Sequence, residues 1–339
     1  MKSPGSTQLR LFALLATASL ALTACGSGET PAETGSGELE VTEIAVGAIP
    51  IVDAGAVHVA VANGYFEEEG LTVTVEPIEG GAAGLPALLN GTYQVIHGNN
   101  VSSINAITSG AGEIVWLAEM FQAGPDTFPI MVAEDSEMDA VEDLEGATIA
   151  VNTLENIGTL AVEATLRTAG LTAEDVEFVA VPFPEMPAAL DSGDVDAAWI
   201  TEPFVTQAHA ELGARILADS MSGPTADFPI AGWMATQEWV EENPNSAAAF
   251  QRAILRGQQA AAEDRNAVES LLPEYAGIEP ETAAAITFGT FPTTMEAERI
   301  QRVADLMFEL GYLEEEFVVD PYLLAPPEGA EPSASASPE

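Results

Sequence analysis

The sequence contains little cysteine and few basic residues. One cysteine among 339 residues allows no internal disulfide and no zinc site built from cysteines. Nine lysine and arginine residues stand against 54 acidic ones, so the formal net charge is −45. Binding of nucleic acid requires clustered basic side chains that displace counterions, and binding to anionic lipid surfaces through a polybasic patch has the same requirement. The composition therefore excludes both kinds of binding.

Long apolar runs are also scarce. The apolar stretch 11–22 is shorter than the roughly 18 residues that a transmembrane helix needs. It follows Lys2 and Arg10, as the apolar part of a secretory signal peptide follows a positive region. It ends at Leu22-Thr23-Ala24-Cys25, which resembles the bacterial lipobox. We therefore predict a lipoprotein signal peptide over 1–24 with lipidation at Cys25; the alternatives are an ordinary signal peptide followed by an incidental cysteine, or a short buried helix.

A lipid on Cys25 would anchor the protein to the extracytoplasmic face of the cell membrane. Residues 25–39 are mainly Gly, Ser, Thr, Glu and Pro, a composition typical of a flexible tether. Residues 326–339 have a similar composition and are predicted to be a disordered tail.

Between these ends, short strand-like runs alternate with helical stretches, a pattern typical of α/β folds with largely parallel sheets. After about residue 236 the chain is predicted to be nearly all helical to 311, and an earlier helix is expected over 85–89. The predicted strands are 41–49, 71–77, 93–97, 114–118, 128–133, 147–151, 176–181, 195–200 and 230–236.

Open parallel sheets bind ligands beyond the carboxyl ends of their strands, so the residues that follow each predicted strand are the candidate contacts. Many are small or carry amides and hydroxyls, which orient a small polar ligand. The predicted ligand-binding residues are Asp53, Gly80, Gly81, Ala82, Asn99, Asn100, Gln122, Asn152, Thr153, Phe183, Thr201 and Glu202.

Three of these segments have a simpler structural interpretation. The turn 80–84 could offer backbone N–H groups to an anion or only connect a strand to a helix. A Thr or Asn in 152–159 could cap the following helix. Glu202 could cap the helix that begins near Pro203, or accept hydrogen bonds from a ligand or a hinge.

The residues that common enzyme mechanisms need are missing from their usual patterns. His58, His97 and His209 lack the spacing of a metal-binding motif, and no serine lies in a G-x-S-x-G turn. The segment 80–84 lacks the lysine of a phosphate-binding loop and the spacing of a dinucleotide fingerprint. We therefore predict a binding protein without a catalytic residue, metal or cofactor.

Six stretches match one family. They are 57–74 with its Gly-Tyr-Phe segment, Leu88-Leu89-Asn90-Gly91, Asp143-Leu144-Glu145-Gly146, 186–190, 193–199, and Glu202-Pro203-Phe204. Together they resemble, over about 41–325, the substrate-binding proteins of ABC importers of the nitrate, sulfonate and taurine class, which are related to thiamine-pyrimidine-binding proteins.

The resemblance implies a type II periplasmic-binding-protein fold, an α/β fold of two lobes joined by two crossover strands. The crossovers are expected near 128–133 and 230–236, which assigns 40–130 plus 230–325 to lobe 1 and 131–229 to lobe 2. The lobes would close on a small-molecule ligand, and the expected partners of the closed monomer are the permease and ATPase subunits of an ABC importer.

The ligand stays undetermined. Some nitrate-binding relatives hold the anion with basic residues, whereas here the arginines after Cys25 are all expected in helices or at their edges: Arg167, Arg215, Arg252, Arg256, Arg265, Arg299 and Arg302. A sulfonate, nitrate or taurine-like solute, a neutral or zwitterionic solute, and a thiamine-precursor pyrimidine are all possible. The alternative functions are an enzyme of the same fold and a binding subunit that reports to a membrane sensor.

Overall fold

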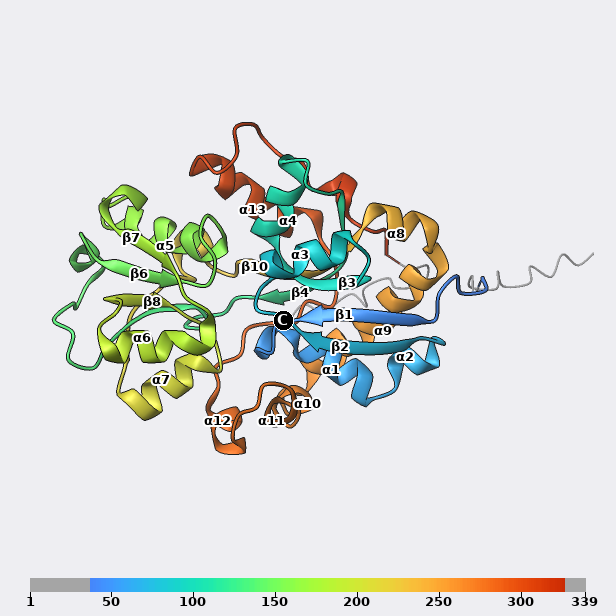
Figure 1. Ribbon diagram of the computed structural model, residues 1–339, viewed down its shortest axis with the longest axis horizontal. Coiled ribbons are helices and arrows are strands. Elements are labelled where there is room, and N and C mark those ends of the chain that lie inside the picture. The colour runs from blue at the N-terminus through green and yellow to red at the C-terminus, as the bar shows by residue number, and fades with distance from the viewer. Residues whose placement is uncertain (1–36, 327–339) are drawn as a thin grey trace, which may run out of the picture. The chain divides into compact units, whose positions relative to one another are not determined.

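The computed structural model describes residues 37–326, which form two five-stranded mixed sheets with helices around them (Figure 1). The predicted signal peptide over 1–24, the predicted lipidation at Cys25 and the predicted tail beyond 326 lie outside the described residues. Of the predicted tether, residues 37–39 are described, and Leu39 packs against the core.

The first sheet has the strand order β2-β1-β3-β10-β4. Strands β1, β2 and β3 are parallel, and β10 is antiparallel to both β3 and β4. We call the part of the protein built on this sheet lobe 1. Its strands are β1 (Glu43–Ala48), β2 (Thr72–Pro77), β3 (Val95–Asn99), β4 (Ile114–Gln122) and β10 (Pro229–Thr236).

The second sheet has the order β7-β6-β8-β5-β9, and the part built on it is lobe 2. Strand β6 is parallel to β7 and β8, and β5 is antiparallel to β8 and β9. In each sheet, the antiparallel strand β10 or β5 is the one that arrives from the other sheet. The strands of lobe 2 are β5 (Pro129–Val132), β6 (Thr148–Val151), β7 (Glu177–Ala180), β8 (Ala197–Trp199) and β9 (Arg215–Asp219).

Helices surround both sheets. In lobe 1, α3 and α4 pack against β3 and β10, and Figure 1 shows them on the opposite side of the strands from α1 and α2. The helices up to β10 are the 3₁₀ helix η1 (Val52–Ala54), α1 (Gly55–Ala62), α2 (Tyr65–Glu68), α3 (Gly81–Leu89), α4 (Asn100–Thr108), α5 (Ile157–Thr168), α6 (Met186–Ser192) and α7 (Phe204–Leu212). Those after it are α8 (Gln237–Glu242), α9 (Pro244–Glu263), α10 (Arg265–Glu269), α11 (Leu272–Tyr275), α12 (Pro280–Ala285) and α13 (Ala297–Glu309).

The chain passes between the sheets twice, over 123–128 and over 220–228. Both passages lie just before the segments predicted as crossovers, which are strands β5 and β10 within the sheets. Each predicted segment is apolar because it is buried in a sheet, and an apolar run alone does not distinguish a strand in a sheet from a connection between sheets.

Three local predictions are wrong. Strand β4 continues to Gln122 instead of ending at 118, because the charge of Glu119 is buried there against Arg299, with 2.9 Å between Nε and Oε2. Helix α3 begins at Gly81 instead of 85, since its small residues fit a first helical turn that packs closely on β3. Arg215, expected at a helix edge, lies in β9, a half-buried edge strand without a clear apolar alternation.

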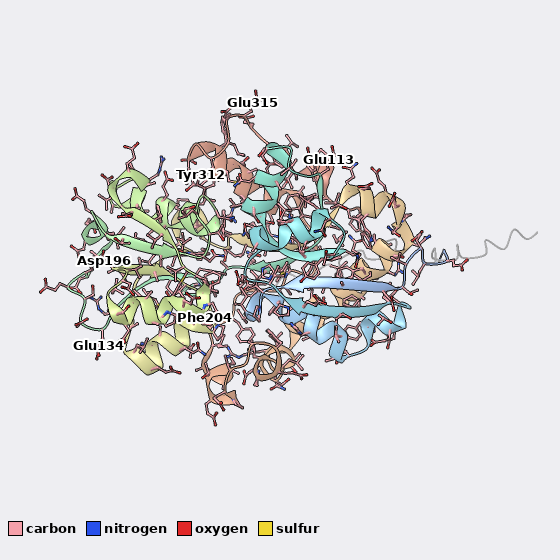
Figure 2. The ribbon with its side chains drawn as sticks, viewed as in Figure 1. Glu113, Glu134, Asp196, Phe204, Tyr312 and Glu315 are labelled. Atoms are coloured by element: carbon pink, nitrogen blue, oxygen red, sulfur yellow. The ribbon has the colours of Figure 1, made fainter. Side chains whose placement is uncertain are left out.

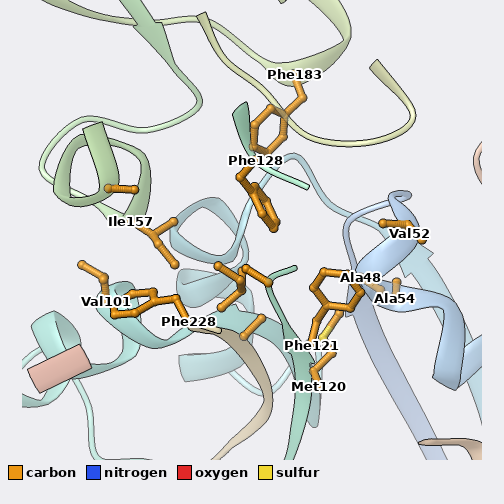
Figure 3. Close-up of a cluster of buried hydrophobic side chains, with 14 of the residues drawn as sticks. Ala48, Val52, Ala54, Val101, Met120, Phe121, Phe128, Ile157, Phe183 and Phe228 are labelled. Carbon is orange, nitrogen blue, oxygen red and sulfur yellow. The ribbon is translucent and has the colours of Figure 1, made fainter. Parts of the chain in front are cut away.

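The buried side chains of the two lobes form one cluster. Figure 3 shows Phe121 and Phe128 near the connection between β4 and β5, with Phe183 of lobe 2 beside Phe128. Among residues 37–326, no helix combines the length and the apolar character needed to cross a bilayer.

Candidate ligand-binding site

The two sheets approach each other at Gly80. This residue follows β2 of lobe 1, and a Cβ atom placed on it would lie 3.7 Å from Nδ2 of Asn152 and 3.9 Å from Oγ1 of Thr153. Both of these residues follow β6 of lobe 2. The structure therefore brings together three residues of the predicted set, from two different sheets.

Helix α3 starts directly on the end of β3. A Cβ atom on Gly81 would lie 3.1 Å from the backbone nitrogen of Asn99 and 3.2 Å from the carbonyl oxygen of His97. Only glycine allows this close approach of the two backbones. Gly81 and the half-buried Ala82 form the first turn of α3, where N–H groups have no partner within a helix and favour an acceptor or an anion.

The two asparagines after β3 hold the structure of lobe 1. The Asn99 side chain caps α4 by accepting a 2.8 Å hydrogen bond from the backbone N–H of Ser102. The fully buried Asn100 donates to the carbonyl oxygen of Pro229 and accepts from Nε1 of Trp116, both at 2.8 Å. These bonds tie α4 to β10 and β4, so the Asn100 amide is engaged within lobe 1.

Helix α5 has its own cap. Asn156 accepts from the backbone N–H of Ile157 at 2.8 Å, and the backbone N–H of Asn156 donates to Oγ1 of Thr159 at 2.8 Å. Asn152 and Thr153 therefore do not cap this helix. Oδ1 of Asn152 is buried and has no hydrogen-bond partner within the described part of the chain. A buried acceptor without a donor is costly, and a ligand with an N–H or O–H group would satisfy it.

Thr201 and Glu202 lie at the junction of the lobes. Oγ1 of Thr201 donates to the carbonyl oxygen of Thr127 at 3.2 Å, next to the first passage between the sheets. The Glu202 carboxylate accepts from the backbone N–H and the hydroxyl of Thr206 in α7, and from the backbone N–H of Thr287 in lobe 1. Burial raises the pKa of Glu202, although these hydrogen bonds favour its charged form. Glu202 thus caps α7 and links it to lobe 1.

Aromatic side chains pack against one another around the first passage between the sheets (Figure 3). The rings of Phe128 and Trp199 stack with centroids 5.1 Å apart, and Phe183 lies 5.9 Å from Trp199. Phe121 meets Phe128 edge to face at 6.4 Å. Phe183 is 5% exposed, so the predicted contact forms part of a closed apolar wall.

Asp53 and Gln122 complete the predicted set. Asp53 lies in η1, directly after β1, and is 1% exposed. Neither of its carboxylate oxygens has a hydrogen-bond partner among residues 37–326, and burial raises its pKa to about 7. Gln122 ends β4, and its backbone N–H and carbonyl pair with Thr290.

Sequence reasoning missed some unpaired polar groups near this site. Nε1 of Trp233 and Nδ1 of His97 are buried without a partner in the described residues, and the two rings are 6.3 Å apart on neighbouring strands. The hydroxyl of Tyr275, in α11, is also buried without a partner there. No local pattern identifies Tyr275, because it reaches lobe 1 from a distant part of the sequence.

A groove of about 1370 Å³ lies elsewhere, between α4, α5 and the segment after α13. Asn105, Glu155 and Tyr312 line it, and Figure 2 shows Tyr312 and Glu315 in that region. None of the residues predicted to bind ligand lines this groove, and most of them are buried. We therefore place the candidate site at the strand ends and not in the groove.

The arginines of the described residues are engaged by other groups, and Arg265 is also close enough to Glu202 for its charge to lower the pKa of that carboxyl. Six of the seven in the described residues pair with carboxylates, and Arg302 donates to the carbonyl oxygens of Ala226 and Asp227. The six pairs are Arg167–Glu163, Arg215–Asp139, Arg252–Glu69, Arg256–Glu68, Arg265–Glu269 and Arg299–Glu119. The polar groups of the site are therefore amides, hydroxyls, backbone N–H groups and carboxylates.

Within residues 37–326, no group of three or more His, Cys, Asp or Glu side chains is arranged to hold a metal ion.

Solved structures share this architecture. The alkanesulfonate-binding protein SsuA from Xanthomonas axonopodis pv. citri, bound to MOPS, matches with a TM-score of 0.69 and 18% identity over 84% of this chain and 99% of that chain. The periplasmic nitrate-binding protein NrtA from Synechocystis matches with a TM-score of 0.70 and 18% identity, over 84% and 86%. These likenesses confirm the predicted periplasmic-binding-protein fold.

Sequence comparison finds relatives named for binding. A nitrate/nitrite binding protein of Nostoc sp. is 26% identical over 241 residues, and the taurine-binding periplasmic protein of Escherichia coli is 26% identical over 202 residues. The matches cover 66% and 58% of this chain but only 54% and 60% of the relatives' own lengths. A putative aliphatic sulfonates-binding protein of Escherichia coli is 28% identical over 235 residues, which is 64% of this chain and 71% of that protein.

The family profile extends over most of the described chain. The NMT1-like family matches residues 37–271, which include both sheets and the strand ends around Gly80 and Asn152. The chain therefore belongs to the NMT1-like family, with relatives that bind nitrate, taurine and aliphatic sulfonates.

Proposed function

We propose that the protein is the extracytoplasmic solute-binding receptor of an ABC importer. It binds a small polar organic solute or an oxyanion, of the sulfonate, nitrate or taurine kind, between its two lobes. The permease and ATPase subunits of the importer are its partners, and it acts as a monomer. The observation that supports this most directly is Gly80 of lobe 1 facing Asn152 and Thr153 of lobe 2.

A ligand at this place would touch both lobes. The first turn of α3 supplies backbone N–H groups from lobe 1, and the unpaired Oδ1 of Asn152 supplies an acceptor from lobe 2. A ligand bound by both lobes favours the closed arrangement, because it binds that arrangement more tightly than an open one. This coupling lets a membrane partner distinguish the loaded protein from the empty one.

Binding is tested with a panel of nitrate, taurine, ethanesulfonate and 4-amino-5-hydroxymethyl-2-methylpyrimidine. Thermal unfolding and tryptophan fluorescence are followed during each titration. A ligand at 100 times its Kd stabilises the folded state by about 2.7 kcal/mol, so binding raises the melting temperature. Trp199 of lobe 2 stacks on Phe128 in the first passage between the sheets and would report a change between the lobes. A panel without any stabilising member would contradict the proposal.

The variant Asn152→Ala separates binding from folding. Since Asn156 caps α5, the loss of Asn152 should weaken binding of the stabilising ligand about tenfold or more and leave the melting temperature of the free protein nearly unchanged. Asn156→Ala is the matched control, which should lower the melting temperature of the free protein because it removes the cap. The opposite pattern would assign Asn152 a structural role.

A thiamine-precursor pyrimidine is the second candidate ligand. The aromatic wall of Phe183, Trp199 and Phe128 favours it, because a flat ring packs well against aromatic side chains. In the panel above, this candidate predicts stabilisation by the pyrimidine in preference to the sulfonates and nitrate.

Lipid anchoring through Cys25 is a further part of the proposal, supported by the lipobox-like sequence Leu22-Thr23-Ala24-Cys25. In cells, Cys25→Ser should move the protein from the membrane fraction to the soluble fraction. Retention of the variant in the membrane fraction would contradict anchoring by a lipid on this residue.

A further inference from the structure

Asp53 is a buried carboxyl group without a partner. It is 1% exposed, and neither of its oxygens meets a hydrogen-bond donor in residues 37–326. The other buried carboxylates of the lobe junction differ in this respect. Glu119 pairs with Arg299, and Glu202 accepts three hydrogen bonds. A carboxylate that is buried and unpaired costs several kcal/mol in order of magnitude, so this position needs an explanation other than packing.

Asp53 lies in the short 3₁₀ helix that follows β1, at the carboxyl end of a parallel strand of the first sheet. It comes five residues after the end of β1, whose neighbours β2 and β3 end at Pro77, three residues before Gly80, and at Asn99. Figure 3 shows Val52 and Ala54, the two neighbours of Asp53 in the chain, beside Ala48 and Phe121 in the buried cluster that also contains Phe183 of lobe 2.

The residues around Asp53 supply no positive charge. Tyr275 is close enough for the Asp53 charge to raise the pKa of its hydroxyl, and this hydroxyl has no partner in the described chain. The ring of His58 stacks on Tyr275 at 3.9 Å, and burial lowers the pKa of His58 to about 4, so this imidazole is neutral at pH 7. The arginines are engaged elsewhere, as described above. Within residues 37–326, no positive side chain is shown close to Asp53, so a cation from outside the chain would be the group that stabilises its ionised form.

We propose that the ligand contains a protonated nitrogen, an ammonium or amidinium group, and that Asp53 binds it. This inference rests on the proposed function and narrows its ligand class. A carboxylate without a partner accepts hydrogen bonds from such a cation, and each charge-assisted bond is about twice as strong as a neutral one. The charge of the whole chain, −45, attracts cations and repels anions at long range.

The remaining polar groups suit the other end of such a ligand. The N–H groups of Gly81 and Ala82 and the amide and hydroxyl of Asn152 and Thr153 can donate to an oxygen acceptor. A zwitterion with a cationic nitrogen at one end and a sulfonate or carboxylate at the other therefore matches the site better than a simple anion.

The experiment uses probes that differ in the nitrogen alone. Taurine is compared with propane-1-sulfonate, and 4-amino-2-methylpyrimidine with 2,4-dimethylpyrimidine, by calorimetric titration into the wild-type protein and into Asp53→Asn. We expect the nitrogen-containing member of one pair to bind, its partner to bind at least tenfold more weakly, and Asp53→Asn to weaken the first by about 10- to 100-fold. Asp305→Asn, an exposed aspartate in α13, is the matched control and should bind as the wild type does.

Other outcomes separate this inference from the proposed function. If propane-1-sulfonate binds as tightly as taurine, or if Asp53→Asn binds the nitrogen-containing probe like the wild type, the role of Asp53 is overturned and solute binding stands. If no probe of either pair binds, the inference is overturned as well. The wider panel, which includes nitrate, then decides whether the proposed function is also wrong. The melting temperature of free Asp53→Asn shows that the variant is folded.

Discussion

At Glu202, three donors converge on one buried carboxylate: the N–H and hydroxyl of Thr206 and the N–H of Thr287. Glu202→Gln removes the charge and places an amide N–H₂ group among donors. We expect the free energy of unfolding of the ligand-free protein to fall by about 1 to 3 kcal/mol, because a donor remains unsatisfied. Urea denaturation measures this change, and Glu298→Gln, at an exposed position in α13, is the control that should have little effect.

A different result would change the interpretation of Glu202. If Glu202→Gln kept the stability of the free protein and lost ligand binding, Glu202 would be a ligand contact and not a cap. The sequence allowed both interpretations, because the position before a helix that begins near proline suits a cap and a strand-end ligand contact equally well.

The carboxyl of Asp53 gives the stability a pH dependence of known sign. Burial raises its pKa from 3.8 to about 7, so between these values the folded state binds more protons than the unfolded state. Stability therefore falls as the pH rises through this window and levels off above pH 7. Relative to Asp53→Asn, the wild type should lose about 2 to 3 kcal/mol of unfolding free energy between pH 5 and pH 8.

The groups near Asp53 do not obscure this effect. The pKa values of His58 and His97 are lowered to about 4 and about 3, and that of Tyr275 is raised, so these three stay neutral from pH 5 to 8. The exposed carboxylates titrate alike in the wild type and in Asp53→Asn, so their effect cancels in the difference between the two unfolding free energies. Denaturation at several pH values measures this difference. A difference that does not change with pH would mean that the Asp53 carboxyl has the same pKa in the folded and the unfolded state.

The position of a single residue was predictable from the sequence where it depends on the fold class alone. Gly80, Asn152 and Thr153 follow parallel strands, and such ends gather at one edge of each sheet. The role of Asn100 was not predictable, because it depends on contacts with Trp116 and Pro229 that are distant in sequence. The Asn156 cap lay within a segment with several possible capping residues, and only the backbone conformation identifies which one caps.

At the scale of elements, the contact of α1 with α9 depends on a glycine. A Cβ atom on Gly257 of α9 would overlap the carbonyl oxygen of Ala56 and lie 2.9 Å from Cβ of Ala60, both in α1. Because these atoms belong to a packed helix, they cannot move aside individually. Gly257→Ala should therefore destabilise the protein by about 1 to 3 kcal/mol, as measured by urea denaturation.

Gly84→Ala is the matched control within another helix. The atom nearest to an added Cβ there is Cδ1 of Ile78, at 2.8 Å, which is the end of a flexible side chain. The variant gains helix propensity of up to about 1 kcal/mol, so its stability should stay the same or rise. Equal destabilisation by both variants would show that loss of glycine in a helix, and not the contact with α1, determines the result.

Elements were predictable where their apolar pattern was simple. Strands β2 and β6 differ from their predicted ranges by a residue at one end, whereas β4 was shortened at Glu119 and β9 was missed. The predicted strand stops before Glu119 because a charged residue is rarely buried without a partner of opposite charge. Its partner, Arg299, lies 180 residues later in the chain, so the sequence near Glu119 does not reveal the pair. An edge strand such as β9 is half exposed and lacks the pattern that a buried strand shows.

At the scale of the molecule, the fold of two lobes was predicted from resemblance to a family and not from local patterns, and the order of strands was not predicted. Nothing in the segments 128–133 and 230–236 themselves indicates that the chain changes sheets before each of them. That information is long-range, since β10 lies between β3 and β4 although it follows them by more than 100 residues. The net charge, in contrast, is a property of the whole molecule that follows directly from the composition.

Among residues 37–326 only four acidic side chains are buried, so most of the negative charge of this part of the chain is in contact with solvent. Exposed acidic side chains lie on the periphery of both lobes, as Figure 2 shows for Glu113, Glu134, Asp196 and Glu315. Their mutual repulsion is weaker in the expanded unfolded chain, so it destabilises the folded state, and salt screens it over about 10 Å at 0.1 M. The midpoint of urea unfolding should therefore rise between 0.05 and 1 M salt, equally in sodium chloride and potassium chloride, because screening depends on ionic strength. An unchanged midpoint would show that repulsion among these carboxylates costs the folded protein little.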